Sequence, residues 1–488
     1  MSGEVLPPIE SVSGGSYGVR AGYAQMLALA SRYERQAGDL AEMATTGGRV
    51  MADGDLLASS VLSPLSFAEA EVQVLDATTG ADGLTVRAVG IEADAVGVRA
   101  VVAAFVASDA FAQHLGEAID TTLGRLAGQA LPRALPVLLA AGGITYVWWS
   151  TLSPREQAEV GAQLTDDLGR LVHDHPDLAQ HLVNSGGGLL DGLTGGLVTG
   201  SAVLTGAGDG PVHGATTNDA ARLMAVLLGD DTDVTVTEVP GVEGGAGVAQ
   251  PDSLRSLVEQ LSMTNDLDEG RGRADLHGAI QVQRVGEEPD DRYIVYLPGT
   301  DDMGPLPGPG GLVRDMETNL QLIGGMDNAY GRGVQQAMLD AGLEGKQVML
   351  VGHSQGGMVS AALAADAEFA RHFTVQHVVT AGAPTAQVEA LPAGTSALHL
   401  ENRGDAVPLL DGEDNPDQPR RTTVLFDEGT HDVVDNHSLD HYVSGAAAAD
   451  ASTDGSIRDQ VEQMRADGFL GSGSGPVQTF VLARSASR

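Results

Sequence analysis

One short segment restricts the fold of this chain more than any other part of its sequence. Residues 347–351, QVMLV, form an apolar run typical of a buried strand, and the Ala-rich run MVSAALAA from residue 358 is typical of a helix. Gly352-His353-Ser354-Gln355-Gly356 stands between them, with glycines where a Cβ would collide with neighbouring backbone. A strand, a G-x-S-x-G turn and a helix in this order predict a nucleophile elbow that raises Ser354 at the helix N-terminus.

Strand-like runs alternate with helical stretches through the second half of the chain. Apolar strands that alternate with helices indicate a mostly parallel sheet with helices on both faces. We therefore expect an α/β domain over residues 230–488, with PVQTFVLAR near the C-terminus as its last strand. The other expected strands are DVTVTEV (233–239), AIQVQRV (279–285), YIVYL (293–297), VQHVV (375–379), ALHLE (397–401) and TVLFD (423–427).

Two amphipathic patterns predict an all-helical region before this domain. Apolar residues recur at alternating steps of four and three from Val19 to Leu40 and again from Leu84 to Phe105. Two such stripes can bury each other as an antiparallel hairpin, and we assign residues 1–115 to this helical hairpin domain. Residues 116–229 form an apolar and Gly-rich helical region without a recognisable motif, for which a lid, a linker domain and a membrane-active segment all stay open.

The strongest membrane candidate is the apolar segment Ala134–Trp149. Its sixteen residues are fewer than the roughly 20 that span a bilayer, so we predict burial in a helical core, with transient contact with a membrane or lipid surface as the alternative. The first residues, MSGEVLPPIESVSGG, have neither the basic nor the apolar stretch of a signal peptide. The expected location is the cytoplasm, or outside the cell after export that needs no signal peptide.

Composition excludes several classes of function. The chain carries 66 acidic and 27 basic residues, and its net charge of −39 repels phosphate backbones and anionic membrane surfaces, so we expect no nucleic-acid partner. The absence of cysteine excludes disulfides, thiolate metal sites and a cysteine nucleophile. The acidic loop that contains Asp411, Asp414 and Asp417 lacks the spacing of an EF-hand, and we interpret it as solvated.

A serine nucleophile needs a general base, and the base needs an orienting carboxylate. Asp405 follows the expected strand ALHLE, at the edge where the sites of α/β sheets assemble. The sequence then offers His431, His437 and His441 as bases. We prefer His437, because it follows the loop VVDN and begins a helical turn, and His441 is the second choice. His353, inside the elbow, is predicted to pack in the core.

Two backbone N–H groups are needed to stabilise the oxyanion of an acyl-transfer reaction. One is the N–H of Gln355, directly after the nucleophile. The other is expected from the loop after the strand YIVYL, where Gly299 permits close backbone approach and Thr300 offers its N–H.

Residues from about 292 to 442 resemble the class 3 lipases, the fungal-lipase-like branch of the α/β-hydrolases. The resemblance rests on five segments in the same order: LPGT at the expected oxyanion loop, RDMETNL, TAGAP, RGDAVPLL and HSLDHY. Pro298, Met316 and Gln355 stand where the family more often has arginine, tryptophan and leucine. The resemblance implies a hydrolase fold, a catalytic histidine at His437 and an ester substrate such as a lipid.

The N-terminal hairpin is similar to the small helical substrates of type VII secretion systems in its length and its lack of a signal peptide. It has neither their Trp-x-Gly turn nor their Tyr-x-x-x-Asp signal. This resemblance implies a secretion partner for the helical region.

Together these residues predict a serine hydrolase that cleaves carboxylic esters through Ser354, His437 and Asp405, with an acyl-enzyme and without a metal ion or organic cofactor. The expected partner is a small-molecule or lipid ester substrate. Two interpretations from other classes stay open. One is a secreted effector whose helical region binds a partner, and the other is a non-catalytic scaffold with a hydrolase fold.

Overall fold

The computed structural model describes residues 6–15, 19–50, 53–80, 83–96, 98–99, 125, 153, 155, 169–170, 172–194, 197–199, 216–229, 233–242, 247–267, 273–302, 304, 311–388 and 390–485. The chain forms two compact units. One unit comprises Met1–Gly18 and Leu115–Arg488, and the other comprises Val19–His114.

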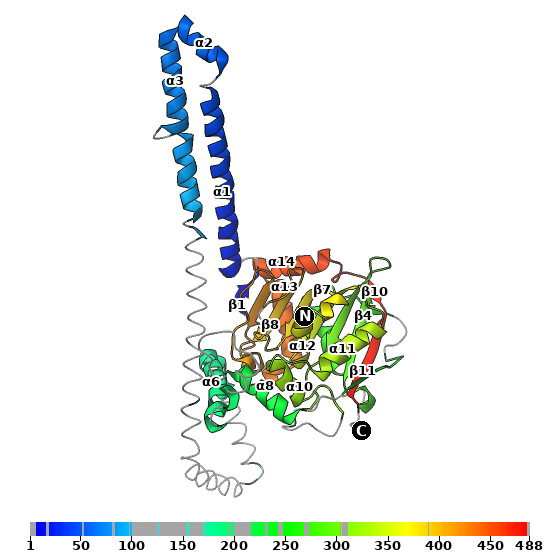
Figure 1. The fold of residues 1–488 in the computed structure, drawn as a ribbon. Coiled ribbons are helices and arrows are strands. Elements are labelled where there is room, and N and C mark those ends of the chain that lie inside the picture. Colours follow the sequence, from blue (N-terminus) through cyan, green and yellow to red (C-terminus); the bar gives the residue numbers. More distant parts are fainter. Residues whose placement is uncertain are drawn as a thin grey trace. The chain divides into compact units, whose positions relative to one another are not determined.

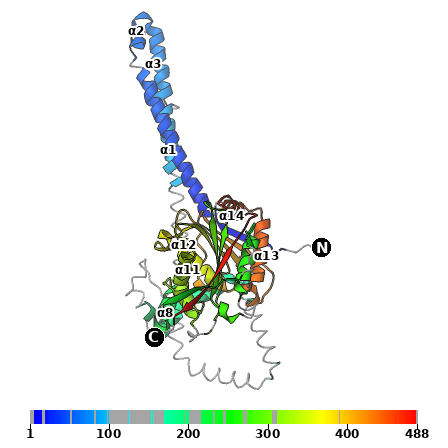
Figure 2. The same ribbon diagram turned by 90° about the vertical axis from the view of Figure 1, so that its right-hand side faces the viewer.

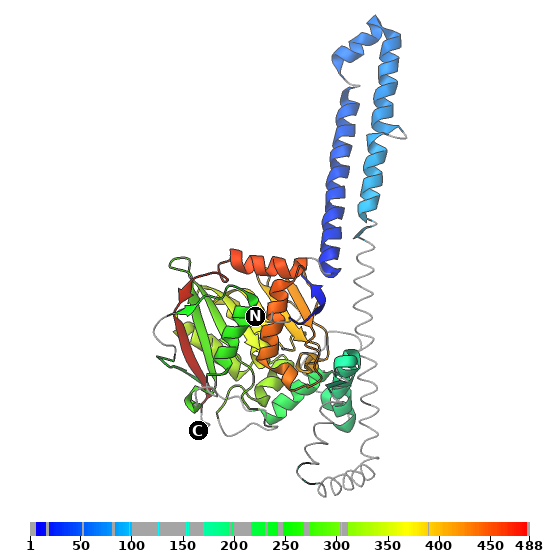
Figure 3. The ribbon, with the colours of Figure 1, turned by 180° about the vertical axis from the view of Figure 1, so that it is seen from behind.

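The unit Val19–His114 contains a long antiparallel helical hairpin. Helix α1 (Val19–Arg49) lies beside α3 (Pro64–Thr79), and the short α2 (Gly54–Leu62) joins them (Figures 1 and 3). A further helix covers residues 84–96, and Arg99 forms a bidentate ion pair with Glu34 of α1 at 2.9 and 3.0 Å. The buried apolar side chains among the described residues are alanines at heptad spacing, which allow the helices to pack closely: Ala30, Ala37 and Ala44 in α1, and Ala88 and Ala95 in the later helix.

The other unit is built on one large sheet. Nine strands of the described residues follow the order β1 (Ile9–Gly14), β9 (Arg421–Phe426), β8 (Ser396–Asn402), β7 (Thr374–Ala381), β6 (Gln347–His353), β5 (Arg292–Leu297), β4 (Ala279–Val285), β11 (Val477–Arg484) and β2 (Val234–Glu238). Strands β5 to β9 are parallel, and the flanking strands pair antiparallel. The short strands β3 (Val248–Ala249) and β10 (Ser474–Gly475) form a separate pair. The predicted α/β class with a mostly parallel sheet is confirmed.

Helices cover both faces of the sheet, as Figure 2 shows with α11 and α12 on one side and α13 on the other. One core lies under α9 (Leu254–Asn265), α13 (Leu439–Ala451) and α14 (Gly455–Ala466), and it takes Met349 and Val351 from β6. The opposite core lies under α10 (Met316–Ile323), α11 (Ala329–Asp340) and α12 (Gln355–Ala365), and it takes Val348 and Leu350. The apolar run of β6 thus fills both faces of the sheet in alternation.

Further helices pack against the elements next to the sheet. Helix α6 (Pro176–Thr194) packs against α8 (Thr217–Leu228) and against the 3₁₀ turn η4 (Val407–Asp411), and α8 also contacts α10. Further 3₁₀ turns are η2 (Ala274–Leu276), η3 (Phe369–Arg371) and η5 (Asp435–His437). Because α6 and α8 belong to the sheet unit, part of the expected region 116–229 packs directly on it.

The first strand, β1, is an element that the sequence pattern does not predict. Its six residues lie inside the segment assigned to the helical hairpin, yet they pair with β9, and Ile9 and Val12 pack against the core. The helical hairpin therefore begins after Gly18, and the residues before it belong to the sheet unit. The run IESVSG is short and mostly polar, and its partner strand lies close to the other end of the sequence, so neither feature is visible as a local signal.

None of the helices among the described residues is long and apolar enough to cross a membrane. The candidate segment Ala134–Trp149 lies outside the described residues.

Candidate active site

The predicted elbow is a strained turn between β6 and α12. Ser354 has φ 53° and ψ −122°, and among the described residues it is the one non-glycine residue with a positive φ. A Cβ on Gly352 would collide with the Gly356 carbonyl, and a Cβ on Gly356 would collide with the Leu297 carbonyl of β5. Strain of this kind, of order 1–3 kcal/mol, persists only where the surrounding structure fixes the backbone. The sharp turn leaves Ser354 at the N-terminal end of α12, just past the carboxyl end of β6.

Asp405 and His437, which the sequence proposed as partners, lie in direct contact. Asp405 follows β8, and its Oδ2 accepts a hydrogen bond of 2.6 Å from His437 Nδ1 on η5. The same oxygen accepts one of 2.6 Å from the Tyr442 hydroxyl, and Oδ1 accepts one of 2.8 Å from the Val407 N–H. With Nδ1 donating to the carboxylate, Nε2 of His437 is the nitrogen that can accept a proton.

His353 connects the elbow to His437. Its ring lies 4.6 Å from the His437 ring, and its Nε2–H donates to the His437 carbonyl over 2.9 Å. Burial, together with the neighbouring His437, lowers the pKa of His353 well below its usual value, so the ring is neutral. His353 is buried, in line with the prediction, and it also holds the backbone of His437. Among the described residues no hydrogen bond joins Ser354 Oγ to His437, a contact that often tightens only when substrate is bound.

The loop with Thr300 lies next to the nucleophile. A Cβ on Gly299 would be 3.1 Å from Ser354 Cβ, so the glycine allows this approach. The N–H groups of Thr300 and Gln355, the expected oxyanion donors, have no acceptor among the described residues.

The side chain of Gln355 contacts helix α10, and helix α10 in turn contacts the loop with Thr300. Its Nε2 donates to the Asp315 carbonyl over 2.7 Å and to Asn319 Oδ1 over 2.9 Å. Asn319 Nδ2 in turn donates to Thr300 Oγ1 over 3.1 Å. A continuous chain of side-chain hydrogen bonds therefore connects the two residues whose N–H groups were proposed as oxyanion donors.

The other two histidines point to different partners. His441 Nε2 lies 3.1 Å from Asp435 Oδ2, and its Nδ1 lies 3.8 Å from Glu428 Oε2. His431 packs its ring against that of His173 at 4.7 Å. Of the three candidates, only His437 contacts Asp405 among the described residues.

The acidic loop after Asp405 is only partly solvated, in contrast to the interpretation from the sequence. Asp411 is 2% exposed, and its Oδ2 accepts a hydrogen bond of 2.7 Å from the Ala386 N–H. Burial raises the pKa of Asp411 to about 7. Burial, followed by the repulsion from Asp411, raises the pKa of Glu401 to about 8.

Sequence reasoning missed the supporting roles of Tyr442, His353 and Asn319. Tyr442 and Asn319 lie inside the segments HSLDHY and RDMETNL, so the resemblance marked their positions without giving a role. The buried hydroxyl of Tyr442 requires a partner, and that requirement was the available signal. Which partner it finds depends on the packing of α13 against β8.

A family model described as the PGAP1-like alpha/beta domain matches residues 332–444. This range contains Ser354, Asp405 and His437 but not the loop with Thr300. No curated protein and no solved structure matches the chain. Residues 332–444, within the C-terminal half of the chain, are thus similar to PGAP1-like α/β domains, a family with the hydrolase fold.

Proposed function

We propose that this protein is a serine hydrolase that cleaves carboxylic esters, with Ser354 as nucleophile, His437 as general base and Asp405 as the carboxylate that orients the base. The observation that carries the proposal is a strained serine turn beside a carboxylate–imidazole contact of 2.6 Å, with His353 of the turn hydrogen-bonded to the His437 carbonyl. Backbone strain retained at a single serine favours a catalytic role over the alternative of a non-catalytic scaffold.

In the proposed reaction, His437 Nε2 takes the proton of the Ser354 hydroxyl while Oγ attacks the ester carbonyl. Asp405 stabilises the imidazolium that forms, and the N–H groups of Thr300 and Gln355 stabilise the oxyanion. The ester C–O bond then breaks, and the leaving alcohol receives the proton from His437. Water, activated by the same histidine, releases the acid and restores Ser354. These steps require no metal ion or organic cofactor.

A lipid ester is the proposed substrate class, and the support for it is the similarity of five segments to class 3 lipases. The helical hairpin is a separate compact unit, which is compatible with a role in binding a secretion partner or another protein. The acidic net charge of −39 argues against nucleic acid as a partner.

A fluorophosphonate probe tests the proposal because it labels an activated serine without knowledge of the substrate. We expect labelling of the full chain and its loss in Ser354→Ala, with ester turnover reduced about 10⁴–10⁶-fold. The matched control is Ser360→Ala in the same helix, where the buried hydroxyl donates to the Gly356 carbonyl over 2.7 Å. Ser360→Ala should keep labelling, and undiminished labelling of folded Ser354→Ala would disprove the proposal.

A further inference from the structure

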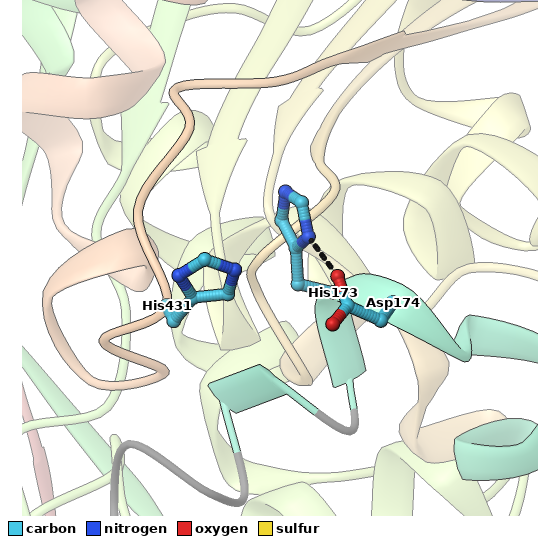
Figure 4. Close-up of side chains that lie close together, drawn as sticks. All are labelled: His173, Asp174 and His431. Atoms are coloured by element: carbon cyan, nitrogen blue, oxygen red, sulfur yellow. Dashed lines mark hydrogen bonds and ion pairs between the residues drawn. The ribbon is translucent and has the colours of Figure 1, made fainter.

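A second cluster of reactive side chains lies outside the proposed active site. His173, Asp174 and His431 each bring one ligand-type atom to within 4.8 Å of the others (Figure 4). His173 Nδ1 lies 3.0 Å from Asp174 Oδ1. His431 comes from the loop after β9, whereas the other two residues precede α6, so the cluster joins segments far apart in the sequence.

The two carboxylates beside the ring nitrogens of His173 favour a cation next to this ring. Its other ring nitrogen, Nε2, lies 3.1 Å from Asp427 Oδ1. A neutral imidazole has one N–H, so when Nε2–H donates to Asp427, the lone pair of Nδ1 faces the Asp174 carboxylate. Two electron-rich atoms at 3.0 Å repel each other unless a proton or a metal ion lies between them.

The backbone around the cluster is held in place. Arg403 Nε donates to the His173 carbonyl over 2.9 Å, and the Arg403 guanidinium also pairs with Glu10 of β1. Gly169 approaches the His431 carbonyl so closely that any Cβ would collide with it. The two segments therefore meet both at the backbone and at the side chains.

We propose that His173 Nδ1, Asp174 and His431 bind a divalent transition metal ion, with Zn²⁺ as the ion that fits them best. Imidazole nitrogen and carboxylate oxygen are common zinc ligands at about 2.0–2.2 Å, which places ligand atoms of a tetrahedral site about 3.4 Å apart. Asp427 holds the opposite nitrogen of His173, the arrangement that fixes the tautomer of zinc-bound histidines. Water fills the fourth position.

An ion has access to this cluster from solvent. A cavity of about 580 Å³ opens beside it, lined by Asp174, His175, Pro176, Leu178, His181 and Arg403. The net charge of −39 raises the local concentration of cations. A bound ion would link the segment before α6 to the loop from Asp427 to His437, and thereby restrain the loop that carries the proposed general base.

The test is Zn²⁺ binding to the untagged full-length chain after chelator treatment, measured by isothermal titration calorimetry. We expect one Zn²⁺ per chain and a visible spectrum typical of tetrahedral Co²⁺ when Co²⁺ is added instead. Affinity should fall at least about 10-fold in Asp427→Asn and further in Asp174→Asn and His431→Gln. Mg²⁺ and Ca²⁺ should not compete, because they prefer oxygen ligands alone.

The matched control is His372→Gln, which removes a histidine that contacts Glu344 at 3.4 Å and should bind Zn²⁺ as the unchanged chain does. Asp174 is exposed, so Asp174→Asn is expected to fold even if His431→Gln does not. The proposal is wrong if the unchanged chain binds no Zn²⁺ saturably, which would mean that a proton occupies the site. It is also wrong if Asp174→Asn binds Zn²⁺ undiminished.

Discussion

At the scale of single residues, the carboxylate of Asp405 is the acceptor that positions the proposed general base. It is 2% exposed and accepts three hydrogen bonds, from His437 Nδ1, the Tyr442 hydroxyl and the Val407 N–H. Burial raises the pKa of Tyr442 well above its usual value, so the phenol stays protonated and remains a donor. Hydrogen bonds to a charged carboxylate are stronger than neutral ones, so Asp405 is fixed in orientation and can fix its histidine.

The choice between His437 and His441 can be tested by comparing two alanine variants. His437→Ala should abolish fluorophosphonate labelling and lower ester turnover about 10⁴-fold or more, because the serine loses its base. His441→Ala removes a ring that contacts Asp435 and Glu428, so labelling should stay near that of the unchanged chain. Labelling would be measured with both variants at matched folding. Loss in His441→Ala alone would reverse the assignment.

At the scale of elements, the sequence predicts what is local and misses what depends on contacts between distant segments. The strand, turn and helix around Ser354 follow from adjacent residues, and apolar runs such as that of β6 indicate burial on both faces. The contact between Tyr442 and Asp405 depends on how α13 packs against β8, for which the sequence has no periodic signal. Likewise, nothing in the segment RDMETNL reveals that Asn319 reaches the loop after β5.

Helix α10 should control the efficiency of the proposed oxyanion hole through Asn319. Asn319→Ala breaks the hydrogen bonds to Gln355 and Thr300, so the loop after β5 loses a restraint without losing a group that touches substrate. Oxyanion donors act mainly in the transition state, and we expect kcat to fall about 10–100-fold with little change in KM.

The measurement is steady-state hydrolysis of a short-chain ester. Asn265→Ala at the C-terminal end of α9 is the control, since that amide donates to the neighbouring Asp266 over 3.4 Å and to no other described residue. Equal kcat in the two variants would show that α10 does not position the loop.

At the scale of the whole molecule, the start of the chain and a late strand form one edge of the sheet. β1 pairs with β9 over Ile9–Gly14, and the Asp427 N–H continues the ladder by donating to the Pro8 carbonyl over 3.2 Å. The domain expected over residues 230–488 lacks β1, so a fragment with that boundary would expose the unpaired edge of β9. It would also lack α6, which packs on η4 near Asp405. The residues before the hairpin therefore support the fold of the residues that carry the proposed site.

Two glycine variants measure how much β1 contributes to stability. Gly14 has φ 66°, and a Cβ there would collide with the Arg421 carbonyl of β9, whereas Gly342 has φ 79° with open space around it. Gly342→Ala should lower the free energy of unfolding by about 1–2 kcal/mol, the cost of the left-handed backbone alone. Gly14→Ala should cost about 1–3 kcal/mol more, because the added methyl group forces β1 away from β9. Urea denaturation of the full chain compares the two.

Below its melting temperature, Gly14→Ala should still be labelled at Ser354, since β7 and β8 stand between β9 and β6. Equal stability of the two variants would mean that the β1–β9 pairing adds nothing to the fold.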